Sequence, residues 1–498
     1  MTGYKDHPPL APLLIGYDPF TDLPDDHLAR LVEDVVEMFV APPPKALRPG
    51  QPERDPRVLL KVILYSCLTG VHSSRRMAQN CHENLAYLLL VRDDRPCHTA
   101  LADARRSEGK TLRQLFSRLK EMAKQLGIPF LGRISMDSSK FSAIASHDSI
   151  VGRNDYDAVI ATFETILALV EEADALEDLE GSPVKTSTGA SRDQMREVLR
   201  SVGKGREKDL ELSPRMVKRV RKSLEAVKAA KKADVSHVST TDPDSRMMLI
   251  GADKTLGMGY QFEAVTDGGN LIVGRTGNHA GDGGRLLPLF ELAQEVDPVP
   301  IVQVTADSGY FSTSQVLQLE NSGVDVVVPD STTVRELRFG PSAPESAPIQ
   351  FVKVEGRNAY RCPEGNILMP SGHKNKSGQL FARYIASREC TNCPLAQQCL
   401  RQEKTKRRNI YVGELKEVIE EYLKKFKDPE VRKVYNSRGP TIETVFAIIH
   451  SIFGFHRWHV IGNESIASEG ALLSCAYQLK KIQTQLRRMG KSLHEALA

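Results

Sequence analysis

The chain has 498 residues, more than a single hydrophobic core usually supports, so we expect two to four structural units. Its apolar content of 41% and charged content of 26% are those of an ordinary globular protein, and no stretch reaches the roughly 18 uninterrupted apolar residues of a membrane-spanning helix. The net charge is only +4, eight cysteines are too few for a disulfide framework, and the N-terminus lacks a signal-peptide pattern. These features predict a cytoplasmic protein with reduced thiols and no membrane partner.

The first 130 residues are predicted to form a helical domain. Apolar residues recur at helical spacing from Val58 to Leu64 and again from Leu85 to Leu90. The pattern changes at 131–143, where LGRISMDSSKFSA predicts a short strand with Asp137 at its end.

Residues 155–235 are predicted to be helical again and to form a basic insertion. Between Arg215 and Lys232 there are eight Lys or Arg residues and one Glu. Such a helix is a candidate contact to a polyanion, although basic residues on helices more often only solvate a surface. The candidate side chains are Lys218, Arg219, Arg221 and Lys222.

Strand patterns dominate from 247 to 328, in MMLIGA, GYQFEAVTD, NLIVGRTG, IVQVTAD and VDVVVPD. Helical patterns separate the last of these strands, so the predicted fold class is α/β, a mixed sheet with helices packed on it. Asp307 ends the apolar run of IVQVTAD and precedes a Ser-Gly turn. A carboxylate at the carboxyl end of a buried strand is a common element of ligand and metal sites in such sheets.

Residues 331–430 are predicted to be an irregular insertion that carries four cysteines. Cys390, Cys393 and Cys399 lie in RECTNCPLAQQCLR, and Cys362 lies upstream. Four thiolates suffice for a closed tetrahedral Zn²⁺ site. The gap between Cys393 and Cys399 is not a standard zinc-ribbon spacing, so free or redox-active thiols and an iron–sulfur cluster are the alternatives.

A third acid, Glu443, lies on a predicted apolar helix near the C-terminus. Two strand-borne aspartates and one helix-borne glutamate suggest a site for Mg²⁺ or Mn²⁺ that serves phosphoryl transfer. Asp137 and Asp307 would flank the ions, and Glu443 would complete one coordination shell. Most acids of a chain are only solvated, but a carboxylate on a mostly apolar helix is otherwise unfavourable, which favours a site.

Three stretches carry a resemblance to a known family: MDSSKF, ADSGYFS and YNSRGPTIETVFAIIHSIFGFHRW. In this order they resemble the catalytic blocks of bacterial insertion-sequence transposases of the DDE (RNase H-like) superfamily, closest to the IS4-like group and its IS1182-type branch. The third stretch is similar to a Tyr-x2-Arg…Glu-x6-Lys signature, which Tyr435, Arg438 and Glu443 match. Arg438 suits bidentate phosphate binding, whereas Tyr435 either contacts the DNA end or is a packed aromatic residue.

The chain departs from that signature at two points. Four residues separate Arg438 from Glu443 where the signature has three, and His450 stands where the signature has a Lys or Arg. His450 is two helical turns after Glu443 and would share its face, but a permanent positive charge is missing. His456 and Arg457 follow nearby as alternative cations.

The resemblance implies a transposase that binds the element's double-stranded ends as a homodimer and catalyses metal-dependent cleavage and strand transfer. It implies an N-terminal DNA-binding domain (1–130), an RNase H-like core (131–330), the Cys-containing insertion (331–430) and a C-terminal helical part of the core (431–498). The alternatives are a related metal-dependent nuclease and a catalytically inactive DNA-binding descendant. His450 supports the inactive descendant, whereas the retention of all three acids counts against it.

Overall fold

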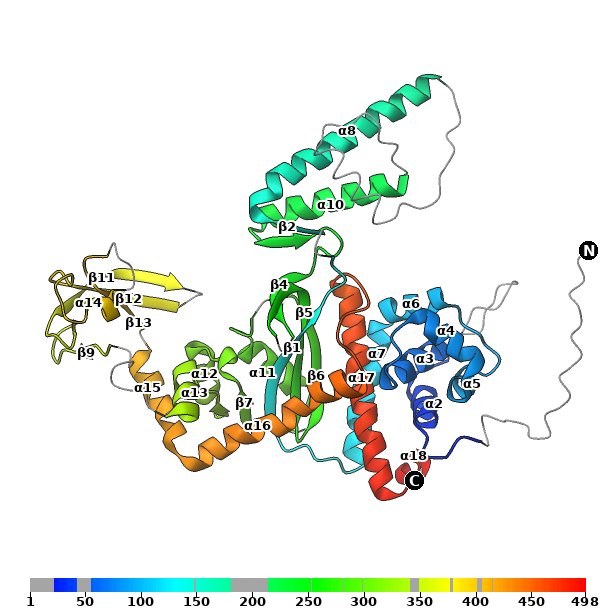
Figure 1. Ribbon diagram of the computed structural model, residues 1–498. Coiled ribbons are helices and arrows are strands. Elements are labelled where there is room, and N and C mark those ends of the chain that lie inside the picture. The colour runs from blue at the N-terminus through cyan, green and yellow to red at the C-terminus, as the bar shows by residue number, and fades with distance from the viewer. Residues whose placement is uncertain are drawn as a thin grey trace, which may run out of the picture. The chain divides into compact units, whose positions relative to one another are not determined.

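The structure, a computed structural model, is shown in Figure 1. It describes residues 22–42, 55–146, 149–180, 214–251, 253–279, 281–297, 299–340, 349–376, 379–400, 405–413 and 415–498. Contacts divide the chain into two compact units. Unit 1 takes its described residues from Met1–Phe130, Asp137–Gly281 and Ile442–Ala498, and unit 2 from Leu131–Met136 and Asp282–Thr441.

The N-terminal part of unit 1 is helical, as the apolar periodicity predicts. Its helices are α2 (Leu28–Phe39), α3 (Pro56–Leu68), α4 (Ser74–Glu83), α5 (Leu85–Val91), α6 (His98–Ser107) and α7 (Gly109–Gln125). The long C-terminal helix α17 (Asn463–Met489) packs along α7 and also contacts α3 and α6 (Figure 1). The buried faces of these helices belong to one continuous hydrophobic core, which accounts for the wide apolar stripes in the sequence.

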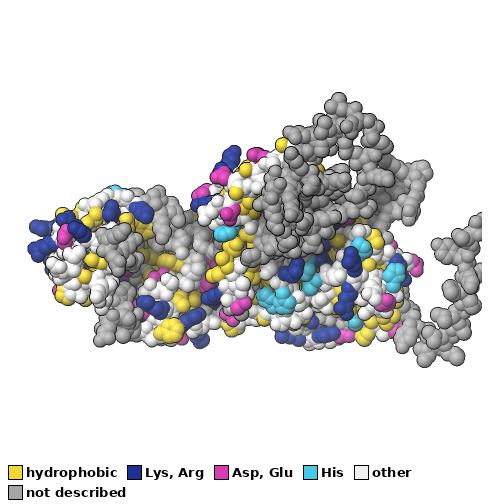
Figure 2. All heavy atoms as spheres, turned by 45° about the horizontal axis from the view of Figure 1, so that its top comes forward, with side chains coloured by type: hydrophobic (Ala, Val, Ile, Leu, Met, Phe, Trp, Pro, Cys, Tyr) yellow, Lys and Arg dark blue, Asp and Glu magenta, His cyan; other side chains and the backbone are white. Residues whose placement is uncertain are grey.

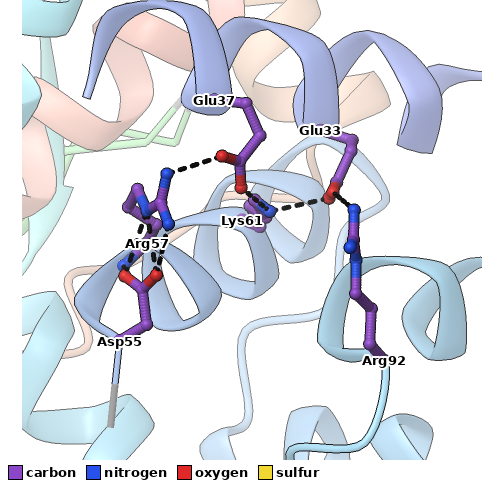
Figure 3. Close-up of polar contacts among 6 residues, drawn as sticks. All are labelled: Glu33, Glu37, Asp55, Arg57, Lys61 and Arg92. Carbon is purple, nitrogen blue, oxygen red and sulfur yellow. Dashed lines mark hydrogen bonds and ion pairs between the residues drawn. The ribbon is translucent and has the colours of Figure 1, made fainter. Parts of the chain in front are cut away.

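A network of ion pairs ties α2 to α3 (Figure 3). The Lys61 side chain is only 4% exposed, and its Nζ lies 2.9 Å from Oε2 of Glu33 and 2.5 Å from Oε1 of Glu37. Arg57 contacts Glu37 at 2.6 Å and also pairs with Asp55, the N-cap of α3. Arg92 lies 3.0 Å from the other carboxylate oxygen of Glu33. The network thus joins three acids, Glu33, Glu37 and Asp55, to three bases, Arg57, Lys61 and Arg92.

A six-stranded mixed sheet has the strand order β4-β5-β1-β7-β8, with β6 paired to β5. Its strands are β1 (Arg133–Ser142), β4 (Arg246–Ile250), β5 (Thr255–Asp267), β6 (Asn270–Gly277), β7 (Gln303–Ala306) and β8 (Asp325–Val327). Strands β1, β7 and β8 are parallel, whereas β4, β5 and β6 pair antiparallel. The predicted mixed α/β fold is confirmed.

The position of Asp137 within its strand differs from the prediction of a short strand that ends there. Strand β1 continues for five residues beyond Asp137, to Ser142, although its pairing with β7 ends at Met136. The polar segment SSKFS hides this continuation, because it lacks the apolar alternation that marks a half-buried strand.

The two helices predicted between the last strands of the sheet are present in unit 2, as α11 (Leu286–Val296) and α12 (Thr313–Asn321). A short 3-10 turn at Ser308–Tyr310 precedes α12, and α13 (Ser331–Phe339) lies in the stretch that the sequence predicts to be irregular. In unit 1, α8 (Tyr156–Glu180) and α10 (Pro214–Lys232) lie side by side, next to a hairpin of β2 (Ile150–Gly152) and β3 (His237–Ser239) (Figure 1). Val220, Leu224 and Val227 of α10 are buried against α8, and residues 181–213 of the predicted insertion lie outside the described residues.

The sequence predicts that the stretch 331–430 is irregular, but the structure shows a five-stranded antiparallel sheet there. Its strands are β9 (Val352–Lys353), β10 (Tyr360–Arg361), β11 (Ile367–Lys376), β12 (Gln379–Ala386) and β13 (Asn409–Gly413). The short helix α14 (Ala396–Cys399) lies between β12 and β13 in the chain, and α15 (Lys416–Lys424) follows β13. Few residues of this sheet are buried, among them Tyr360, Leu368 and Tyr384. Its strands therefore carry no clear hydrophobic period.

The C-terminal segment consists of helices. Helix α16 (Pro429–Ala447) carries Glu443 as predicted, and it runs directly into a π-helical turn at Ile448–Ile452. Helix α17 follows after a short loop, and α18 (Leu493–Leu497) ends the chain with a capping box at Ser492. No helix in the described part of the chain is both long and apolar enough to cross a membrane.

Candidate active site and DNA-binding surfaces

The register of β1 and β7 places the two aspartates at equivalent points of neighbouring strands. Met136 pairs with Ala306 in parallel register, and Asp137 and Asp307 directly follow these two residues in the sequence. Oδ1 of Asp137 accepts a hydrogen bond from the backbone N–H of Ser138 at 2.8 Å. Both carboxylates are half-buried, so they are accessible to a ligand.

A cluster of three hydroxyl groups in unit 2, which we call the hydroxyl cluster, joins the elements that lead to the acids. Its members are Ser135, Thr305 and Thr441. Oγ of Ser135 lies 2.9 Å from Oγ1 of Thr305 and 3.1 Å from Oγ1 of Thr441. Ser135 and Thr305 are 7% and 5% exposed, so these hydrogen bonds form in a dry environment where they hold their elements firmly.

Each member of the hydroxyl cluster stands two residues before one of the predicted acids, in the tripeptides SMD, TAD and TIE. On a strand, residues two apart share a face, so Ser135 and Asp137 lie on one face of β1. This recurrent Ser/Thr-x-Asp/Glu pattern is visible in the sequence. The sequence does not predict the hydroxyl cluster, however, because nothing in it indicates that the three hydroxyl groups contact one another.

A second aspartate lies next to Asp307 in unit 2. Oδ1 of Asp307 accepts the backbone N–H of Gly309 at 2.9 Å. A Cβ atom added to Gly309 would lie 3.0 Å from Oδ1 of Asp307 and 3.3 Å from Oδ2 of Asp282. The two carboxylates therefore flank the glycine, which brings Asp282, from the Gly-rich loop before α11, closer to the predicted site than its sequence position suggests.

Glu443 lies on the exposed side of α16. Its neighbours Ile442 and Val445 are fully buried, which fixes the rotation of the helix and turns Glu443 outward. The π-helical turn begins five residues later, and such turns occur frequently at functional sites. Within the described residues, no group of three or more His, Cys, Asp or Glu side chains is gathered closely enough to enclose a metal ion.

His450 packs against β1 within unit 1. Its ring stacks on Phe141 with 4.9 Å between ring centroids, and its Nε2 lies 3.4 Å from Oγ of Ser139. Ser139 and Phe141 follow Asp137 at two-residue intervals, so His450 lies against the strand face that carries Asp137. Burial lowers the pKa of His450, and the neighbouring His456 lowers it further, so the imidazole is neutral near pH 7.

The other predicted DNA contacts lie at separate places. The guanidinium of Arg438 lies 5.9 Å from the ring centroid of Tyr435, and that ring also packs edge-on against Phe426 in unit 2. Arg457 is exposed beside the end of β1, where it forms an isolated bridge with Ser142. Of the candidates on α10, three are exposed and Arg219 is half-buried; the exposed ones are Lys218, Arg221 and Lys222.

The four predicted zinc ligands line one pocket of about 280 Å³ in unit 2. Sγ of Cys362 accepts the backbone N–H of Asn366 at 3.2 Å, and Sγ of Cys390 accepts that of Arg408 at 3.4 Å. Burial raises the pKa of the Cys399 thiol, and the other three sulfur atoms add to the effect while Arg408 opposes it. The fourth member, Cys393, donates its backbone N–H to the Cys390 carbonyl at 3.2 Å.

Comparisons with known families identify two segments. Residues 361–483 match the transposase DDE domain family, and residues 19–107 match the transposase domain family DUF772. The first match includes most of the Cys-bearing sheet, from Arg361 on, and Glu443, whereas Asp137 and Asp307 lie outside both matches. A search of curated protein sequences finds no significant match.

Transposases with a DDE domain bind DNA and generally use a divalent metal ion. The match to this domain agrees with the mixed, RNase H-like sheet of the fold. The protein is therefore a transposase with a DDE domain, a phosphoryl-transfer enzyme that catalyses DNA transposition.

Proposed function

We propose that Asp137, Asp307 and Glu443 are the catalytic acids and that they hold Mg²⁺ or Mn²⁺. The observation that carries this proposal is the hydroxyl cluster, whose three hydrogen-bonded members each stand two residues before one of these acids. The donor set fits the metal, because Mg²⁺ prefers carboxylate oxygens contributed by separate elements. When bound, the metal would make an oxygen nucleophile more acidic and neutralise charge on the leaving oxygen.

The chain's own residues would orient these acids. The backbone N–H groups of Ser138 and Gly309 bind the carboxylates of Asp137 and Asp307, which restricts their rotation. Neutral His450, beside the face of β1 that carries Asp137, would donate a hydrogen bond to a phosphate without adding charge. Asp282, beside Gly309, is a fourth candidate for the same site.

We further propose that the enzyme belongs to the IS1182-type branch, acts as a homodimer on paired element ends, and performs both cleavage and strand transfer in the bacterial cytoplasm. Arg438 and Tyr435 would bind the DNA end together, because a guanidinium over an aromatic ring offers a charge and a stacking surface. Helix α10 would contact backbone phosphates through Lys218, Arg219, Arg221 and Lys222, and its apolar side is already used against α8.

We propose structural zinc at Cys362, Cys390, Cys393 and Cys399. All four line one pocket, and two of their sulfur atoms accept backbone N–H groups, as sulfur ligands of structural sites do. The small hydrophobic core of this sheet is a reason for a metal to stabilise it. Zinc content measured on purified protein should be one ion per chain and should fall in a Cys393→Ser variant, and its absence from protein expressed with added zinc would reject the site.

The catalytic proposal is tested with a labelled duplex that spans the DNA flanking the gene. Nicking at a defined end should require Mg²⁺ or Mn²⁺ and should be lost in Asp137→Ala, Asp307→Ala and Glu443→Ala. Glu430→Ala is the matched control, since Glu430 is an exposed acid of the same helix α16 in its first turn. Retained nicking in any of the three variants would remove that acid from the site, and nicking without strand transfer would favour a nuclease.

A further inference from the structure

An open pocket of about 620 Å³ lies within unit 1, and none of the predicted acids lines it. We call it the arginine pocket. It is lined by the start of α4, by one side of α6 and by residues 457–460, which follow the π-helical turn. Its charged lining residues are all basic: Arg75, Arg105, Arg106 and Arg457.

The charge of the arginine pocket is only partly balanced by the protein. Neither Arg75 nor Arg457 has an ion-pair partner among the described residues, and both are exposed. Arg106 pairs with Asp103 on its own helix, where both side chains are solvent-exposed. An unbalanced group of arginines attracts an anion, and arginine's planar fork of donors matches phosphate oxygens.

Arg105 gives an independent sign of a ligand. The residue is only 5% exposed, yet its Nε is a buried donor without a hydrogen-bond acceptor. Its other nitrogens have weak partners, Glu469 at 3.8 Å and the sulfur of Met77 at 3.6 Å. Buried donors are rarely left unsatisfied in native proteins, and an unmet donor of a pocket-lining arginine points to an acceptor that comes from outside the chain.

The start of α4 adds to the positive potential. Ser73 caps this ten-residue helix, and Ser74 and Arg75 form its first turn at the rim of the pocket. The free N–H groups and the helix dipole favour an anion there. Figure 2 shows Lys, Arg and His side chains gathered over the part of the surface to which α4 and α6 belong.

We propose that the arginine pocket binds a phosphate group of the DNA backbone. This inference rests on the proposed function, in which the enzyme holds the end of its element. The pocket would receive one or two phosphates between the start of α4 and Arg457. Phosphate contacts of this kind position the duplex and carry no sequence information. A free phosphate or nucleotide has the same chemistry, and the test distinguishes the two sources.

The test measures binding of a labelled duplex from the flanking DNA by fluorescence anisotropy in EDTA, over a range of salt concentrations. The double variant Arg75→Gln/Arg457→Gln should bind about tenfold more weakly or worse, and the slope of log K against log salt should fall by about 2. Arg118→Gln on α7 is the matched control, because Arg118 is 60% exposed and does not line the pocket. A control affinity close to that of the wild type is expected.

A second arm titrates inorganic phosphate into the protein by calorimetry at constant ionic strength. No saturable binding is expected, because one phosphate lacks the rest of the duplex. The DNA assignment would be overturned if the wild type bound phosphate saturably and the double variant lost this binding but kept its DNA affinity. It would also be overturned if the double variant bound DNA as well as the Arg118→Gln control does. If the wild type cleaves its end but the double variant binds it normally, this inference alone fails. A wild type that binds no DNA would overturn the proposed function as well.

Discussion

Two sets of charged side chains in unit 1 differ in how their charge is balanced. In the network of Figure 3, three bases meet three acids, and Lys61 is almost completely enclosed. In the arginine pocket, two of four arginines have no ion-pair partner among the described residues. A charge that the protein balances itself contributes to the fold, whereas a charge left unbalanced at a surface is available to a ligand. The same reasoning applies to Asp307, one of the proposed metal ligands.

The largest expected effect is on activity, from Asp307→Asn. Asp307 forms no ion pair within the described residues, so its charge is expected to serve the reaction. Asparagine keeps the oxygen that accepts the Gly309 N–H, so the turn is retained. Cleavage should fall by about 1000-fold or more, with a change in unfolding free energy below about 1 kcal/mol. Rates of end nicking and a chemical denaturation curve measure both quantities. A large loss of stability would show that the Asp307 charge contributes to the fold and not only to the reaction.

Lys61→Met should have the opposite effect, a loss of stability without a change in DNA affinity. The substitution leaves the carboxylate of Glu33, whose side chain is 12% exposed, without its closest cation. Breaking a buried pair in this way should cost about 3 kcal/mol, whereas DNA affinity of the folded fraction should not change. The control is Arg92→Gln, which removes a 60% exposed partner of the same Glu33 and should cost at most about 0.5 kcal/mol. Equal losses in the two variants would show that burial does not decide the effect.

Much of the six-stranded sheet could be predicted from the sequence, because its strands have strong apolar runs, and the proposed catalytic acids stand in recognisable blocks. Asp307 directly after β7 and Glu443 on α16 are such cases. The extension of β1 beyond Asp137 and the sheet of β9–β13 could not be predicted, since polar runs such as SSKFS in β1 and SGHKNK in β11 interrupt the apolar pattern.

Sites built from distant segments were also beyond reach of the sequence. The arginine pocket combines residues near 75, 105 and 457, and no local spacing indicates that they meet. The hydroxyl cluster repeats one short pattern three times, but only tertiary packing shows that Ser135 contacts both threonines. Such contacts depend on long-range register, which local patterns do not determine.

A smaller effect is expected from Gly309→Ala. The φ angle of Gly309 lies outside the left-handed region, so alanine causes no backbone strain there. Its methyl group would press against the carboxylates of Asp307 and Asp282, at 3.0 and 3.3 Å, and displace them by a few tenths of an ångström. We expect cleavage to fall by about tenfold with little change in stability. Gly283→Ala is the control, because a Cβ atom there meets nothing within 4 Å, and equal rates in both variants would argue against a role for this carboxylate pair.

The smallest effect concerns the pH dependence of stability at the edge of the arginine pocket. The pKa of His72 is lowered from its ordinary 6.5 to about 4, chiefly by burial. The neighbours His459 and Arg105 contribute to this shift, while hydrogen bonding to the Phe453 carbonyl and the charge of Glu469 oppose it. The folded protein therefore holds His72 neutral at a pH where the unfolded chain has already bound a proton. This contribution is complete above pH 6.5 and is lost as the pH falls toward 4.

Between pH 7 and 5 the loss should be about 1 kcal/mol, after allowance for partial exposure of the ring. Denaturation curves at several pH values measure it as the difference between the wild type and His72→Gln, since glutamine keeps a donor for Phe453 but does not titrate. The variant should lose less stability than the wild type over this range. Parallel curves would mean that the pKa of His72 is the same in the folded and unfolded states, so that its burial does not shift it.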